Sequence, residues 1–184
     1  MKKALVLVDI QNDYFPGGRH ELVGPDQAAH AAARLLSFFR ERAWPIVHVQ
    51  HISQRAGADF FLPGTPGADI HASCAPGPDE AVILKHAPDS FLGTDLKDRL
   101  DGMGMQHLVI AGMMTHMCID TTVRSAAAKG YTIELIEDAC ATRALERGSV
   151  TVPAEQVQQA FLAAMNGAFA TVMPADAWIA AQEG

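Results

Sequence analysis

The chain has 184 residues, which is enough for one domain with a sizeable core, and we expect a single domain over residues 1–184. Hydrophobic residues make up 49% and aromatic residues only 7%, as is typical of a sheet covered by helices. The formal net charge of −7 argues against binding to nucleic acid or to an anionic membrane, since both require basic patches.

The first half of the chain begins with an apolar run that predicts a strand buried on both faces, at residues 3–8. This run is interrupted by Asp9 and has no small-residue cleavage site, which argues against a signal peptide. Apolar residues at helical spacing predict a helix over residues 26–43. A second strand at 45–50 and a long loop over 53–79, rich in Gly and Pro, follow.

The second half alternates in the same way. We predict strands at residues 81–84, 108–111, 131–136 and 168–172, with helices at 94–100, 121–129, 153–166 and after Pro174. Strands that alternate with helices indicate an α/β fold: a doubly wound, mostly parallel six-stranded sheet with helices on both faces, in a Rossmann-like three-layer arrangement.

Three polar residues follow strands of this predicted sheet. Asp9 and Lys85 come directly after the first and third strands, and Cys118 follows the fourth by a short loop. Sites in such folds form beyond the carboxyl ends of the strands, so we expect the three side chains to meet at one edge.

Each of these residues also has a simpler interpretation. Cys118 precedes a helix whose dipole favours a thiolate, although most free cysteines are small buried hydrophobes. Asp9 is a general-base candidate or a carboxylate that caps a loop, and Lys85 on its own would be a surface lysine. The catalytic interpretation depends on the three residues meeting.

Four segments, in order along nearly the whole chain, resemble the isochorismatase-like hydrolases, a family that includes nicotinamidases and carbamoylsarcosine amidohydrolases. They are LVLVDIQNDYF, VILKHAPDSF, AGMMTHMCIDTTVRSAAAKGY and IEDACATR. The resemblance implies an Asp–Lys–Cys catalytic triad at Asp9, Lys85 and Cys118. It also implies a cis peptide between Met113 and Met114, with an oxyanion hole formed by the N–H groups of Met114 and Cys118.

Substrate-binding positions are implied in the same way. Asp13, Phe15 and Phe91 match positions that line the pockets of the family, and His116 is a weaker candidate, together with Tyr14, Phe60, Phe61 and Met117.

The segment after the second strand departs from the metal-dependent nicotinamidases. Those enzymes carry a D-x-H segment there, whereas this chain reads HVQHISQ and lacks the Asp. His48 and His51 are three residues apart on a strand, so they face opposite ways and are poor co-ligands. We therefore predict no catalytic metal and no cofactor.

The predicted function is hydrolysis of a C–N bond in a small amide, carbamoyl or ureido substrate through a thioester on Cys118. The first alternative is an enol-ether hydrolase of the isochorismatase type that uses Asp9 as general acid. The second is a non-catalytic binding protein or a thiol redox sensor with Cys140 as resolving partner. Three cysteines without CxxC spacing are typical of a reducing cytoplasm, and the resemblance implies a homodimer or homotetramer.

Overall fold

The computed structural model describes residues 3–183. Its centre is a six-stranded parallel sheet with strand order β3-β2-β1-β4-β5-β8, which confirms the predicted fold class. The strands of this sheet are β1 (Lys3–Val8), β2 (Ile46–His51), β3 (Ala81–Lys85), β4 (His107–Met113), β5 (Thr132–Ala141) and β8 (Thr171–Met173).

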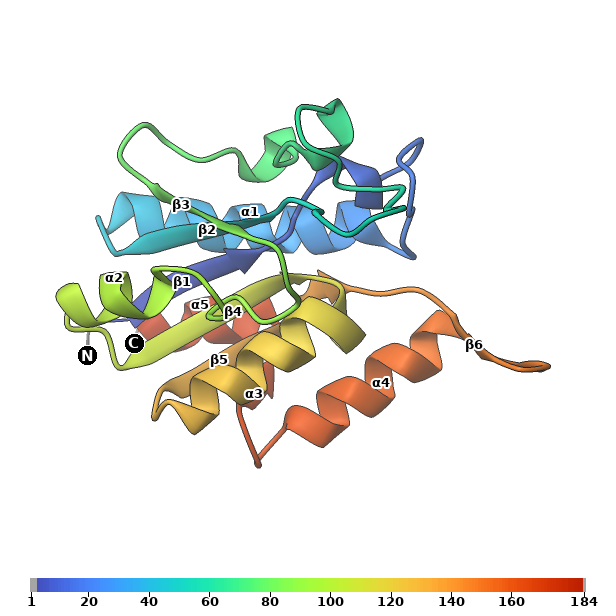
Figure 1. Cartoon of the computed structure of the whole chain (residues 1–184). Helices are drawn as coiled ribbons and strands as arrows, with labels where there is room; N and C mark the ends of the chain where they lie inside the picture. The colour runs from blue at the N-terminus through green and yellow to red at the C-terminus, as the bar shows by residue number, and fades with distance from the viewer. Residues whose placement is uncertain (1–2, 184) are drawn as a thin grey trace.

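Helices cover both faces of the sheet (Figure 1). Two helices pack with Leu5, Leu7 and Val109 on one face, and they are α1 (Pro25–Glu41) and α5 (Ala175–Glu183). Val6, Leu108 and Ile110 face the other layer, which contains α2 (Leu96–Gly102), α3 (Asp120–Ala128) and α4 (Ala154–Met165). None of the helices within residues 3–183 is both long and apolar enough to cross a bilayer.

Strands β1 and β4 approach each other closely because of a glycine. Gly112 has φ +138°, and a Cβ at this position would lie 1.9 Å from the carbonyl oxygen of Val8. Sheet order reverses between these two strands, since β2 and β3 lie on one side of β1 and β4 lies on the other. Ligand sites form at such switch points, at the carboxyl ends of the strands.

Several elements differ from the sequence prediction. Strand β5 continues to Ala141, five residues beyond its predicted end, with an irregular register opposite β4. Strands β6 (Leu145–Arg147) and β7 (Val150–Val152) form a hairpin that projects from the body of the molecule in Figure 1. The predicted long loop contains two short helical turns, η2 (Pro66–Ala68) and η3 (Ala72–Cys74). These turns are held by contacts with distant segments, so local sequence patterns did not predict them.

Candidate active site

Four neighbouring strands each supply one polar side chain to the same edge of the sheet. Lys85 ends β3 and His51 ends β2. Asp9 directly follows β1, and Cys118 follows β4 after a short turn. The cysteine, a carboxylate oxygen of Asp9 and a ring nitrogen of His51 lie within 4.8 Å of one another. Residues 9, 85 and 118, which are far apart in the sequence, therefore meet as predicted.

Asp9 and Lys85 form a fully buried ion pair. The chain turns sharply after β1, with Asp9 in the left-handed region at φ +52°, a conformation that Asp tolerates better than most residues. Lys85 Nζ lies 2.8 Å from Asp9 Oδ2 and donates a hydrogen bond to the carbonyl of Pro88. Burial alone would lower the pKa of Lys85, but its interactions in the site, above all with the charge of Asp9, outweigh burial and raise that pKa.

Cys118 lies in a π-helical turn, η4 (Thr115–Ile119), that leads directly into α3. Its side chain is buried, and burial, followed by the charge of Asp9, raises the pKa of the thiol well above its ordinary value. Burial thus opposes the stabilisation of a thiolate that we expected from the helix N-terminus. The thiol rests in its protonated form beside the carboxylate.

His51 is the site residue that sequence reasoning missed. Its Nδ1 lies 3.9 Å from Asp9 Oδ2, and its backbone N–H and carbonyl are both bound by the side chain of Gln11. Burial lowers the pKa of the imidazole, although Asp9 opposes this shift. From the sequence, His51 was considered only as a metal ligand, whereas its position opposite Lys85 follows from the register of β2 and β3.

His48 and His51 do face opposite ways on β2, as their spacing predicted. His48 is buried with its Nε2 2.7 Å from Glu80 Oε2, away from the triad residues. The two histidines are thus not co-ligands of one ion. The absence of a catalytic metal stays a prediction.

The peptide bond between Met113 and Met114 is cis, which confirms that expectation. Met114 is buried at the start of η4, and its carbonyl accepts hydrogen bonds from the N–H groups of Met117 and Ile119. The assignment of the oxyanion hole to the N–H groups of Met114 and Cys118 remains a prediction.

Asp13 attaches the long loop to the segment after β1. Its Oδ2 accepts a hydrogen bond of 2.6 Å from the N–H of Phe61, and its Oδ1 accepts one from the N–H of Arg19. Gly67 is packed so closely that a Cβ there would lie 2.1 Å from the same carboxylate. These contacts show that Asp13 holds the loop in place. A contact between Asp13 and substrate stays a prediction.

The other predicted pocket residues have different neighbours. Phe15 stacks on His71, with ring centroids 3.7 Å apart. Phe91 belongs to the same buried cluster as Cys118 and stacks on Tyr131. His116 is half-buried, with its Nδ1 2.6 Å from the hydroxyl of Thr142. Their contact with substrate also stays a prediction.

Tyr14 was a weaker candidate and lies within electrostatic reach of the triad. The ring is buried and packs edge-on against Phe61. Burial, followed by the charges of Cys118 and Asp9, raises the pKa of the phenol well above its ordinary value. The hydroxyl therefore remains protonated beside the thiol and the carboxylate.

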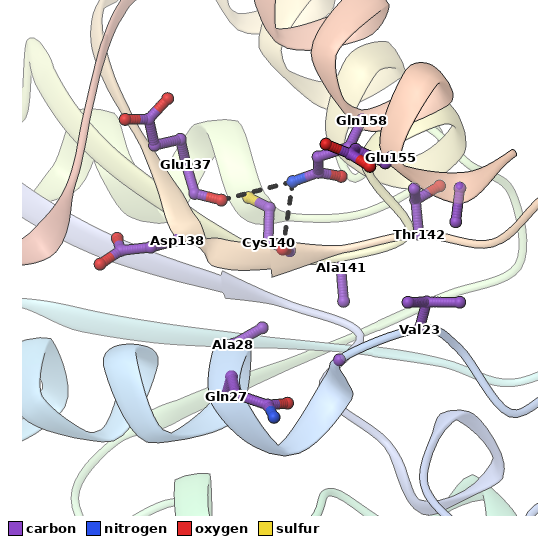
Figure 2. A pocket seen from close by; sticks show the side chains of 12 residues that line it. Val23, Gln27, Ala28, Glu137, Asp138, Cys140, Ala141, Thr142, Glu155 and Gln158 are labelled. Atoms are coloured by element: carbon purple, nitrogen blue, oxygen red, sulfur yellow. Dashed lines mark hydrogen bonds between the residues drawn. The ribbon is translucent and has the colours of Figure 1, made fainter.

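Figure 2 shows a cavity of about 350 Å³ beside the end of β5. Cys140 lines it, and burial raises the pKa of this thiol to about 12. Gln158 Nε2 donates to the carbonyls of Glu137 and Cys140, as the dashed lines indicate. None of the triad side chains lines this cavity, although Cys140 and Cys118 belong to the same buried cluster of the core.

Comparison with known proteins gives consistent results. The isochorismatase domain model matches residues 3–177. An isochorismatase family protein of Bacillus subtilis, YddQ, is 51% identical, covering 97% of this chain and 99% of its own length. The crystal structure of an isochorismatase hydrolase from Oleispira antarctica is 49% identical with a TM-score of 0.93, covering 97% and 96% of the two chains. N-carbamoylsarcosine amidase from Thermoplasma acidophilum is 25% identical with a TM-score of 0.81, covering 96% and 98%.

Proposed function

Because the chain belongs to the isochorismatase family of hydrolases, we propose that it cleaves a C–N bond of a small amide, carbamoyl or ureido substrate through a thioester on Cys118. The supporting observation is the buried contact of Asp9 with Lys85 and Cys118. The similarity to N-carbamoylsarcosine amidase supports C–N cleavage over the enol-ether chemistry.

The first chemical step follows from the state of the thiol. Cys118 is protonated at rest, so its sulfur becomes nucleophilic only as Asp9 takes the proton during attack on the carbonyl carbon. Apart from its contacts with Lys85 and Cys118, the carboxylate of Asp9 receives no hydrogen bond from residues 3–183, which leaves lone pairs free for that proton. The Lys85 ammonium stabilises the carboxylate and fixes its position.

The remaining steps return the enzyme to its starting state. The N–H groups of Met114 and Cys118 bind the tetrahedral oxyanion, Asp9 gives its proton to the departing nitrogen, and the C–N bond breaks. Water then attacks the thioester as Asp9 accepts a proton from it, the C–S bond breaks, and Asp9 returns that proton to the sulfur, so that the acid product leaves and the thiol is regenerated. Loss of one oxyanion donor typically costs about a hundredfold or more in rate.

The test is an assay of ammonia or amine release from nicotinamide, carbamoyl and ureido compounds, with isochorismate alongside. Cys118→Ala should lose at least ~10³-fold in turnover, because the nucleophile is absent. The matched control is Cys140→Ala, which removes a buried thiol outside the triad and should keep wild-type turnover. Substantial activity of Cys118→Ala on isochorismate would favour the enol-ether mechanism and overturn the thioester.

A further inference from the structure

We propose that Asp9, His51 and Cys118 form a three-ligand site for a thiophilic divalent cation such as Zn²⁺, and that the bound ion holds the enzyme inactive. The site is distinct from a catalytic metal centre because it uses the nucleophile itself as a ligand. Binding of the ion does not depend on the proposed reaction, whereas inhibition rests on it.

The donor set matches the chemistry of zinc. Thiolate, imidazole and carboxylate are its three common protein ligands, and a tetrahedral ion needs the ligand atoms roughly 3.3–3.6 Å apart. The three donors here already lie within 4.8 Å of one another, so side-chain rotations alone can bring them to that spacing. Three protein ligands leave a fourth position for water or another small donor.

Asp9 supplies an unusually available oxygen ligand. Both of its carboxylate oxygens are buried, and neither has a hydrogen-bond donor of good geometry within residues 3–183. Lys85 Nζ lies 2.8 Å and His51 Nδ1 lies 3.9 Å from Oδ2, so the carboxylate keeps lone pairs that an ion can use. A buried polar atom without a partner costs free energy, and a bound cation removes that cost.

His51 is a preorganised ligand at the mouth of the cluster. The side chain of Gln11 accepts the N–H of His51 at 2.7 Å and donates to its carbonyl at 2.9 Å, so both backbone groups are fixed. Gln11 is itself held by the carbonyl of Ala68 in the long loop. The His51 side chain is 15% exposed while that of Asp9 is fully buried, so an ion can approach along the histidine.

Binding of the ion and catalysis exclude each other. The cation displaces the thiol proton of Cys118 into solvent, and a sulfur lone pair then forms the metal–sulfur bond instead of attacking a carbonyl. The ammonium of Lys85 repels the cation, since it lies 2.8 Å from the same carboxylate. The ion is therefore reversible and can be removed by a chelator.

The experiment is titration of chelator-treated protein with Co²⁺, followed by absorption of the thiolate-to-cobalt charge transfer in the near ultraviolet. We expect one ion per chain, displacement by Zn²⁺, and no charge-transfer band in Cys118→Ala. His51→Gln and His51→Ala should each weaken binding on the order of 100-fold. Cys140→Ala is the control and should bind like the wild type.

Two results would overturn the proposal: no charge-transfer band in the wild type, or a band that Cys118→Ala retains. An inactive Cys118→Ala variant together with a wild type that binds no Co²⁺ would refute the site and leave the proposed function intact. Co²⁺ binding that depends on Cys118, together with full turnover of Cys118→Ala, would refute the function and leave the site intact.

Discussion

Two groups of polar side chains, one partly exposed around Glu80 and one fully buried around Asp9, lie on opposite sides of strand β2, and they use their hydrogen-bonding capacity differently. In the first, Glu80 accepts from both Nε and Nη2 of Arg40, lies 2.7 Å from His48, and accepts the N–H of Gly77. In the second, the carboxylate of Asp9 lies beside Lys85, His51 and Cys118 and accepts no hydrogen bond from any other group within residues 3–183.

The difference separates a structural ion pair from a reactive one. Glu80 is saturated by donors, and its pKa falls to about 2, mainly through the hydrogen bonds from Arg40, so it stays charged and holds α1, β2 and the loop together. Asp9 keeps unused lone pairs beside a protonated thiol, which suits a group that must accept and return a proton. The two clusters should therefore respond differently to substitution.

The largest effect is expected from Lys85→Met. It leaves the Asp9 carboxylate buried without its ammonium, and breaking a buried pair in this way typically costs about 3–5 kcal/mol. Urea denaturation measures this loss, and turnover should vanish as well. The double variant Asp9→Asn with Lys85→Met should recover much of the stability and none of the activity. A Lys85→Met variant as stable as the wild type would contradict a tightly coupled pair.

Glu80→Gln should cost less, about 1.5–3 kcal/mol, because it weakens charge-assisted hydrogen bonds without stranding a fully buried charge. Turnover on the best substrate should stay close to wild type, since this cluster does not contact the triad. Asp79→Asn changes an exposed neighbour and is the control for urea denaturation. A large loss of turnover with little loss of stability would contradict the structural role of Glu80.

Lowering the pH should remove the stabilisation that the charged carboxylate of Glu80 contributes. The folded-state pKa of Glu80, about 2, lies below its ordinary value of 4.5, so the stability it contributes is present above about pH 4.5 and is lost as the pH falls towards 2. The stability difference between the wild type and Glu80→Gln should therefore shrink between pH 5 and pH 3. Denaturation curves across this range measure it, and a constant difference would contradict the assignment.

The smallest effect is expected at a surface pair. Arg99 Nε lies 2.7 Å from Asp95 Oδ2 at the start of α2, and both side chains are about half exposed. Solvent screens such pairs, so Arg99→Gln should change stability by no more than ~0.5 kcal/mol. If Arg99→Gln lost as much stability as Glu80→Gln, solvent exposure would not explain the difference between the Arg99–Asp95 pair and the Glu80 cluster.

The sequence predicted the cluster around Asp9 better than the cluster around Glu80. Asp9, Lys85 and Cys118 could be found because each follows an apolar strand, and the resemblance to a family supported their roles. The cluster of Arg40, His48 and Glu80 could not be found, since its members come from a helix, a strand and a loop with no shared pattern. His51 was considered only as a metal ligand, because its position beside Asp9 depends on how β2 lies against its neighbouring strands.

The cytoplasmic location and the homo-oligomer implied by the resemblance stay predictions. The family assignment supports a small-molecule substrate.

The sequence by itself determined the alternation of strands and helices and the polar residues at the strand ends, because apolar runs and the residues that end them are local features. Parallel strands joined by crossovers then bring those ends to one edge. Only the tertiary structure decided the protonated thiol of Cys118, the unused oxygens of Asp9 and the place of His51. Those properties depend on which distant segments exclude water from each group, and no local pattern contains that information.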